Sequence, residues 1–207
     1  MKLYKSPAGR GIFPSVTEIL KVIEKPYYNR WRHRVGEKEA ARIMADAATF
    51  GSRLHKVAEL VACKQERSVE PDMQPYAAAV REFLDLYILD VLGTELEIVS
   101  PKLGFGGTID LYGQMLDGSY VVVDFKSTGQ LTREHGLQVS AYALLLQDAG
   151  MRINKRIVVR VKRDKPGTWY ARNYSNHAED VRAFLACKEL WYWQKKNQLG
   201  KLAKGAA

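Results

Sequence analysis

Two aspartates and a lysine interrupt two apolar stretches of the chain, Gly-Thr-Ile-Asp110-Leu-Tyr and Val-Val-Val-Asp124-Phe-Lys126. A carboxylate inside such a stretch is costly to bury unless a cation holds it. Because side chains alternate along a strand, Asp124 and Lys126 share one face and Phe125 takes the other. If the two strands are neighbours, both carboxylates and the ammonium group converge. That set suits Mg²⁺ or Mn²⁺, and the lysine could orient or deprotonate a water or stabilise charge on a phosphate.

The elements that must position these residues lie in the second half of the chain, where apolar residues begin to alternate. The glycines from Gly104 to Gly107 predict a turn or a close approach of the backbone to another group. Thr132 and Gly150 mark the start and stop of a long helix. We expect strands over 95–100, 106–115, 119–127, 153–163 and 168–174, a hairpin turn at 117–118, and helices over 133–149 and 177–198.

The first half of the chain is mainly helical by the same criteria. Ser15 to Glu18 has the form of a capping box, and Gly93 resembles a helix C-cap. We expect an irregular or extended lead-in over 1–14, with Pro7 and Gly9 in it, and helices over 15–24, 37–48, 50–66 and 76–92, the middle two forming either separate helices or one bent helix. The element order predicts an α/β fold with a mixed sheet. We interpret 1–207 as one domain, with a helical cap over 1–93 and an α/β core over 94–207.

Composition points towards a polyanionic partner. The chain has 32 Lys and Arg against 23 Asp and Glu, a formal net charge of +9. This favours nucleic acid first and a membrane surface second, although a basic balance can also serve solubility alone. The two cysteines are too few for a disulfide scaffold or an iron–sulphur cluster. No signal-like or membrane-spanning stretch is found, so we expect a cytoplasmic protein, in the host cell if phage-encoded, with no membrane partner.

A basic, aromatic segment runs from Tyr27 to Arg34. Aromatic faces interleaved with guanidinium groups can stack on bases and hold phosphates. The alternative, equally weighted, is an amphipathic helix that buries its rings and solvates its arginines. The candidate nucleic-acid contacts here are Arg30, Trp31, Arg32 and Arg34.

The chain resembles the PD-(D/E)XK nucleases, and within them the RecB-like exonuclease branch. Asp110 followed by Asp124-Phe-Lys126 matches the core motif of the family. Gly51-x-x-x-His55 resembles the histidine motif of the branch, and Gln138-x-x-x-Tyr142 its glutamine–tyrosine motif. The four motifs occur in the family's order over about residues 51–146. The resemblance implies a restriction-endonuclease-like core, a mixed central sheet flanked by helices, with the N-terminal helical cap added.

The resemblance also implies roles for individual residues. The implied metal ligands are His55, Asp110, Asp124 and the backbone carbonyl of Phe125, for Mg²⁺ or Mn²⁺. Lys126 would act on the attacking water or the scissile phosphate, and Gln138 and Tyr142 would brace the lysine strand or contact the nucleic-acid backbone. A further acidic residue is expected near the first strand, with Glu97 favoured and Glu95 as the fallback. Arg53 and Ser127, next to these motifs, are additional candidates for nucleic-acid contact.

The function expected is that of a metal-dependent DNA exonuclease acting on single-stranded or linear DNA, as in recombination or repair. A helical cap carrying His55 could form an arch that admits a strand end. Two alternatives remain: a structure-specific endonuclease or junction resolvase, and a catalytically idle nucleic-acid-binding protein of the same fold. The sequence does not decide the polarity of digestion, DNA against RNA, or the number of metal ions.

Overall fold

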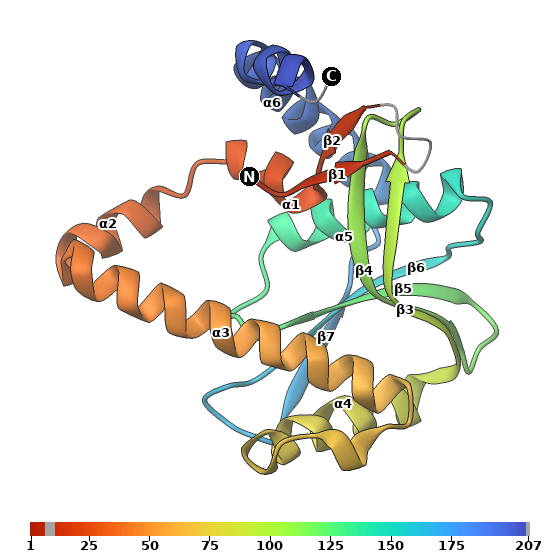
Figure 1. The fold of residues 1–207 in the computed structure, drawn as a ribbon. Helices are drawn as coiled ribbons and strands as arrows, with labels where there is room; N and C mark the ends of the chain where they lie inside the picture. Colours follow the sequence, from red (N-terminus) through yellow and green to blue (C-terminus); the bar gives the residue numbers. More distant parts are fainter. Residues whose placement is uncertain (7–10, 206–207) are drawn as a thin grey trace.

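The computed structural model describes residues 1–6 and 11–205, of which 197–205 are described by their backbone only. The predicted lead-in residues Pro7 and Gly9 lie outside the described residues. A five-stranded sheet in the order β3-β4-β5-β6-β7 forms the centre of the molecule (Figure 1). Strands β5 and β6 are parallel and the other neighbours are antiparallel, so the sheet is mixed as predicted. The strands are β3 (Ile88–Ser100), β4 (Phe105–Met115), β5 (Tyr120–Lys126), β6 (Lys155–Val161) and β7 (Trp169–Asn173).

Helices cover both faces of this sheet. The described helices are α1 (Val16–Ile19), α2 (Pro26–Val35), α3 (Glu37–Ala62), α4 (Gln74–Tyr87), α5 (Arg133–Asp148) and α6 (His177–Gly205), with short 3₁₀ turns η1 (Leu20–Val22), η2 (Glu66–Ser68) and η3 (Pro71–Met73). One core forms between the sheet and α3 and α4, and the other between the sheet and α1, α5 and α6. None of the described helices has the length and apolarity that crossing a membrane requires.

Strand β5 belongs to both cores, which explains its apolar sequence. Val121 and Val123 pack towards α3 and α4, whereas Val122 packs towards α5 and α6. All three side chains are fully buried, as expected for a central strand covered on both faces. The alternation places Asp124 on the α5 side, so this carboxylate faces a helix rather than solvent.

The start of the sheet differs from the prediction. The helix predicted over 76–92 ends at Tyr87, and Ile88–Gly93 belongs to β3. Two register shifts in the β3–β4 ladder, between Ile88 and Asp90 and between Val91 and Gly93, leave one extra residue each on β3. These bulges interrupt the alternation of apolar residues, so the segment resembles a helix in sequence. The cap therefore does not extend to residue 93.

The N-terminal segment, predicted as irregular or extended, contains two short strands. Strands β1 (Leu3–Lys5) and β2 (Ile12–Pro14) pair as an antiparallel hairpin. Ser15 caps α1 as predicted, because its hydroxyl accepts the backbone amide of Glu18 at 3.0 Å. The hairpin contacts β4, and α1 is buried in the second core. This part of the chain belongs to the core rather than to a cap.

Helix α3 is one continuous element of 26 residues with two different halves. Its second half, from Phe50 to Ala62, packs against the sheet. Residues 41–49 are exposed throughout, and α2 has no buried residue. Figure 1 shows α2 and the first half of α3 extending together away from the sheet. We refer to these residues, 26–49, as the arm.

The glycines before Asp110 serve as predicted. Gly104 has φ +79°, which a turn at this position requires. A Cβ on Gly107 would lie 2.7 Å from Cε1 of Tyr142, so α5 can approach β4 closely only because this residue is glycine. The glycines thus bring the helix that carries Gln138 and Tyr142 against the strand that carries Asp110.

Candidate active site

The two aspartate strands are neighbours, as the sequence predicts. The β4–β5 ladder runs from Gln114 opposite Tyr120 to Leu111 opposite Val123, and its pairing stops there. Asp110 and Asp124 are the next residues on the two strands. Beyond this point, Phe125 donates its backbone amide to Oδ2 of Asp110 at 2.7 Å. The Asp110 side chain therefore satisfies an amide that the ladder leaves open, and this bond fixes its carboxylate beside β5.

Asp124 is held from two sides in an almost closed environment, with 1% of its surface exposed. Its Oδ1 accepts hydrogen bonds from Nζ of Lys126 at 2.8 Å and from Nε2 of Gln138 at 2.9 Å. Gln138 also donates to the hydroxyl of Tyr142 at 2.9 Å. Oδ2 of Asp124 lies 2.6 Å from Nζ of Lys126, yet it accepts no hydrogen bond from any described residue. Among the described residues, this buried oxygen is therefore paired only with the Lys126 ammonium.

His55 reaches the same place from α3. Its Nδ1 lies 3.0 Å from Oδ2 of Asp110. Burial lowers the pKa of His55, but the hydrogen bond and charge of Asp110 outweigh burial, so the pKa lies above its ordinary value. The four-residue spacing between Gly51 and His55 places both on one side of α3, where Gly51 lies next to the Ser127 hydroxyl.

Glu95, the fallback, lies in this cluster, and the favoured Glu97 does not. Within the described part of the chain, ligand atoms of His55, Glu95 and Asp110 come within 4.8 Å of one another. Glu95 has φ +47°, a left-handed conformation that costs a non-glycine residue roughly 1–3 kcal/mol. This conformation breaks the alternation from which the sequence placed both glutamates on one face. The preference for Glu97 is therefore corrected to Glu95.

The electrostatics of the cluster favour a cation. The pKa of Glu95 is raised by burial and then by the charge of Asp110. The pKa of Asp124 is also raised, first by burial and, against the opposing charge of Lys126, by Asp110. Carboxylates that repel one another in a confined space are stabilised by a hard divalent ion. The oxygen-rich donor set, with one imidazole, fits Mg²⁺ or Mn²⁺, and His55, Glu95, Asp110 and Asp124 are the groups that would hold it.

If Glu95 and not Glu97 is a metal ligand, substitutions at the two positions should differ in their effect on Mn²⁺ affinity. Glu95→Gln is expected to weaken Mn²⁺ binding by about tenfold or more, because a charged ligand is lost from a confined site. Glu97→Gln makes the same chemical change two residues along β3 and should leave the affinity for Mn²⁺ unchanged. Isothermal titration calorimetry of both variants measures this. Equal effects of the two substitutions would contradict the placement of Glu95.

Several residues that the sequence did not single out complete the site. A pocket of about 260 Å³ is lined by Lys2, Thr17, His55, Glu95, Thr108, Asp110, Asp124, Lys126, Gln138 and Tyr142. Lys2 comes from the N-terminal hairpin, where its ammonium lies 3.5 Å from the Thr108 hydroxyl. Tyr4 holds the same hydroxyl at 2.8 Å. No motif marks these residues, since they approach the site only through the long-range packing of the hairpin on β4.

The predicted nucleic-acid contacts fall into different environments. Trp31 of α2 contacts the Tyr28 ring, and Arg32 pairs with Glu37 at 3.1 Å, so these two are partly engaged. Arg30 and Arg34 are exposed on the arm and have no ion pair with any described residue. Arg53 is different, because both Glu70 and Asp72 pair with its guanidinium group. Ser127 follows Lys126 at the end of β5 and lines an open pocket with Arg160 and Arg163.

His135 is half-buried at the start of α5. Its Nδ1 accepts the backbone amide of Thr132 at 2.8 Å, which completes a capping box. Burial and then the charge of Lys126 lower its pKa to about 4. His135 is thus neutral and serves as a cap.

A pH dependence of stability follows from His135. Above its ordinary pKa of 6.5 both folded and unfolded states hold it neutral, and as pH falls towards about 4 the unfolded state takes up the proton first. Stability should be lost over this window, by roughly 1–3 kcal/mol after allowance for partial exposure. His135→Gln keeps a cap acceptor without titrating, so its melting temperature should fall less between these pH values. Parallel melting curves for both proteins would contradict this assignment.

Comparison with known proteins places the chain in a family. Residues 25–191 match the family model of the PD-(D/E)XK nuclease superfamily, so the chain belongs to this superfamily. Its five-stranded mixed sheet with flanking helices agrees with the restriction-endonuclease-like fold expected from the sequence. The superfamily cleaves nucleic acids with the help of divalent metal ions.

Two solved structures are distantly similar. The crystal structure of SSO0001 aligns with a TM-score of 0.40 and 17% identity, over 84% of each chain. The crystal structure of LHK-Exo in complex with dAMP aligns with a TM-score of 0.34 and 18% identity, over 71% of this chain and 85% of that one. A search of curated proteins found no significant match.

Proposed function

We propose that this protein is a metal-dependent DNA exonuclease of the RecB-like branch, acting on the ends of single-stranded or linear DNA. The observation that carries the proposal is the cluster around Asp124. A carboxylate with 1% exposure is held by Lys126 and Gln138 and lies one strand from Asp110, which His55 contacts. A fold that only bound nucleic acid would have no use for buried acids facing a phosphate.

The metal ligands and Lys126 have separate roles in the proposed hydrolysis. When bound by His55, Glu95, Asp110 and Asp124, a divalent cation supplies positive charge against the phosphate and makes water more acidic. The carbonyl of Phe125 is proposed as a further ligand by resemblance alone. Water attacks phosphorus in line with the leaving oxygen, and charge builds up on the other phosphate oxygens. Lys126 stabilises that charge.

The surroundings of Lys126 support this role. An ammonium group has three donors, and Oδ1 of Asp124 accepts one of them, so donors remain for a phosphate oxygen or the attacking water. Gln138 holds the same carboxylate from the opposite side, and Tyr142 holds Gln138. These two residues act on the reaction through Asp124, and we describe them as positioning residues.

The arm supports action on strand ends. It joins the half of α3 that carries His55, and its base is tied to α5 by an ion pair of 2.6 Å between Lys25 and Glu134. Arg30 and Arg34 present unpaired guanidinium groups on it, and Tyr27 is 58% exposed. A single strand passing beside the arm would meet cations and a ring before the metal ligands. Such threading favours a free end over an internal site.

Digestion of labelled DNA tests the proposal. Linear single-stranded DNA, linear duplex and closed-circular single-stranded DNA are incubated with Mg²⁺ and, separately, with Mn²⁺. Degradation of linear but not circular DNA is expected, and the labelled end then gives the polarity. Cleavage of circles would favour the structure-specific endonuclease instead. Tight, salt-sensitive binding without cleavage of any substrate would identify an idle nucleic-acid-binding protein.

A further inference from the structure

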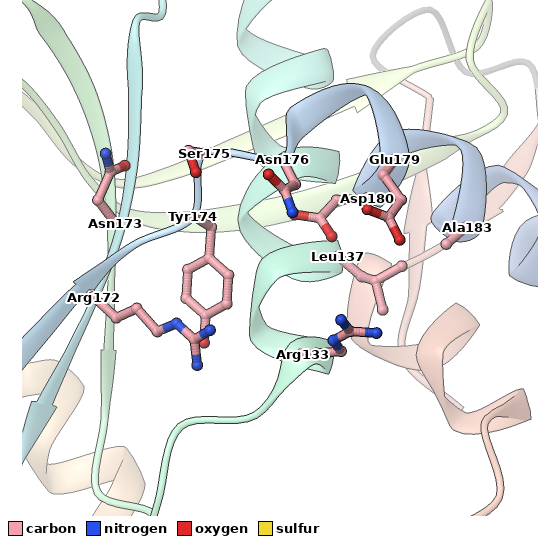
Figure 2. A pocket seen from close by; sticks show the side chains of 10 residues that line it. All are labelled: Arg133, Leu137, Arg172, Asn173, Tyr174, Ser175, Asn176, Glu179, Asp180 and Ala183. Carbon is pink, nitrogen blue, oxygen red and sulfur yellow. The ribbon is translucent and has the colours of Figure 1, made fainter.

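A second polar pocket lies on the other side of α5, away from the pocket that holds Asp124. It has a volume of about 240 Å³ and is formed by the start of α5, the end of β7 and the start of α6 (Figure 2). Figure 2 shows Arg172 beside the Tyr174 ring, Arg133 across the pocket from it below Leu137, and the carboxylates of Glu179 and Asp180 above Leu137. The Tyr174 ring lies between the strand and helix α5. None of these residues lines the pocket that holds Asp124.

The two arginines are available for a ligand. Neither guanidinium group forms a hydrogen bond or an ion pair with any described residue, and both side chains are exposed. Arg172 makes one contact, lying 5.0 Å from the centre of the Tyr174 ring, which holds its stem over the pocket. A third arginine beneath them, Arg156, is buried and donates to the backbone carbonyls of Tyr174 and Ser175. Three cations therefore face two carboxylates, and the part of the pocket lined by Arg133 and Arg172 favours an anion.

Arg160 and Arg163, which line the open pocket beside Ser127, provide a contrast. Arg160 donates to the Thr128 carbonyl at 2.7 Å and lies 3.8 Å from Asp164. Arg163 pairs with Asp46 at 2.9 Å and stacks on Phe50. These side chains hold the protein's own loop and arm. Arg133 and Arg172 form no ion pair or hydrogen bond with any described residue, although Arg172 packs over the Tyr174 ring, so both guanidinium groups keep donors for an external partner.

The pocket and the candidate active site share helix α5. Leu137 lines one pocket and the next residue, Gln138, lines the other. Arg133 precedes Gln138 by five residues, which corresponds to about 7.5 Å along a helix axis. The pKa of Tyr174 agrees with this proximity: burial raises it most, Arg172 opposes the rise, and the charges of Asp180 and Asp124 add to it.

We infer that Arg133 and Arg172 bind a backbone phosphate of the substrate strand outside the pocket that holds Asp124. This inference rests on the proposed nuclease function and extends it by one subsite. A phosphodiester carries one negative charge and two free oxygens, which two guanidinium groups can contact together. Glu179 and Asp180 repel the neighbouring phosphate, so the strand crosses the part of the pocket lined by the arginines and does not run along the pocket.

Binding of a labelled oligothymidylate, measured in EDTA over a series of salt concentrations, tests the subsite without requiring hydrolysis. For a single strand, each phosphate contact contributes about 0.7 to the slope of log affinity against log salt. Because both arginines contact one phosphate, Arg133→Ala/Arg172→Ala should flatten the slope by about 0.7 and weaken binding roughly fivefold or more near 0.1 M salt. Arg133→Lys/Arg172→Lys keeps both charges and should retain most of the slope. This second variant guards against a loss that comes only from misfolding.

The control removes two charges elsewhere. Arg67 lies on η2 and Arg152 follows the far end of α5, and both are exposed. Arg67→Ala/Arg152→Ala should leave the slope unchanged. An unchanged slope in the Arg133/Arg172 variant, or an equal change in the control, would overturn the subsite. So would loss of thymidine monophosphate binding with intact strand binding, because the pocket would then hold a free nucleotide. A protein that binds the strand through these arginines but never cleaves would refute the nuclease function alone.

Discussion

Replacement of Asp124 by asparagine is expected to lower hydrolysis of linear single-stranded DNA by about a thousandfold. Asparagine keeps the shape and leaves an acceptor for Gln138, which now donates to Oδ1 of Asp124 at 2.9 Å. It removes the negative charge that the metal ion and Lys126 both require. Lys126→Met, of similar length without charge, should cause a loss of similar size because the charge developing on the phosphate is no longer stabilised.

Initial rates with an end-labelled strand and excess Mg²⁺ measure both losses. Asp85→Asn is the matched control, because Asp85 is exposed on α4, remote from the pocket. This variant should cleave at the rate of the parent protein. Strand binding and melting temperature, recorded for every variant, separate a chemical defect from a folding defect. Asp124→Asn protein that is folded and still cleaves within about tenfold of the parent rate would remove Asp124 from the chemistry.

Gly107→Ala should destabilise the protein by roughly 1–3 kcal/mol and reduce cleavage as well. The added Cβ would lie 2.7 Å from Cε1 and 3.1 Å from Cδ1 of Tyr142, with Leu145 at 3.3 Å. Tyr142 cannot easily yield, because it is 4% exposed and its hydroxyl accepts a hydrogen bond from Gln138. Relief of the clash must therefore move either α5 or the strand that carries Asp110. Either movement displaces the carboxylates relative to each other.

Thermal melting and initial rates measure the two effects of Gly107→Ala. Gly129→Ala is the control, since a Cβ there would meet nothing within 4 Å and its backbone is not left-handed. The control should melt close to the parent protein. If Gly107→Ala melts as the parent does and cleaves normally, then α5 does not need its close approach to β4.

The strands that carry the chemistry could be predicted because their sequences are constrained by burial on both faces. An aspartate between Val123 and Phe125 has few structural uses, and the neighbouring hairpin turn makes β4 and β5 adjacent. The long helix α5 was predicted to within one residue at its end for a similar reason. Thr132 and Gly150 mark its two limits by local chemistry alone.

The acidic partner of the metal site could not be predicted in the same way. Choosing between Glu95 and Glu97 requires the backbone angle at Glu95, and a positive φ at glutamate leaves no mark in the sequence. The same limit applies to the start of β3, where two bulges interrupt the apolar alternation and make the spacing of the strand resemble that of a helix. Lys2 reaches the pocket only because a hairpin distant in sequence docks on β4.

The basic residues show a further limit of sequence reasoning. The sequence alone does not distinguish Arg53 from Arg30. In the structure Arg53 is neutralised by Glu70 and Asp72, whereas Arg30 is exposed. The basic residues of β6 are likewise not equivalent, since Arg156 is buried and donates to backbone carbonyls. Charge becomes informative about a ligand only when its internal partners are known. Arg133 and Arg172 belong to no sequence motif, and only the structure shows that they form no ion pair with a described residue.

The central claim is that His55, Glu95, Asp110, Asp124 and Lys126 form a metal-dependent nuclease centre. Its most direct test is hydrolysis of an end-labelled linear single strand by the wild-type protein, first in EDTA and then after addition of excess Mg²⁺ or Mn²⁺. We predict no hydrolysis in EDTA and rapid release of labelled product once either metal is added. Hydrolysis that persists undiminished in EDTA, or that fails with both metals, would contradict the claim.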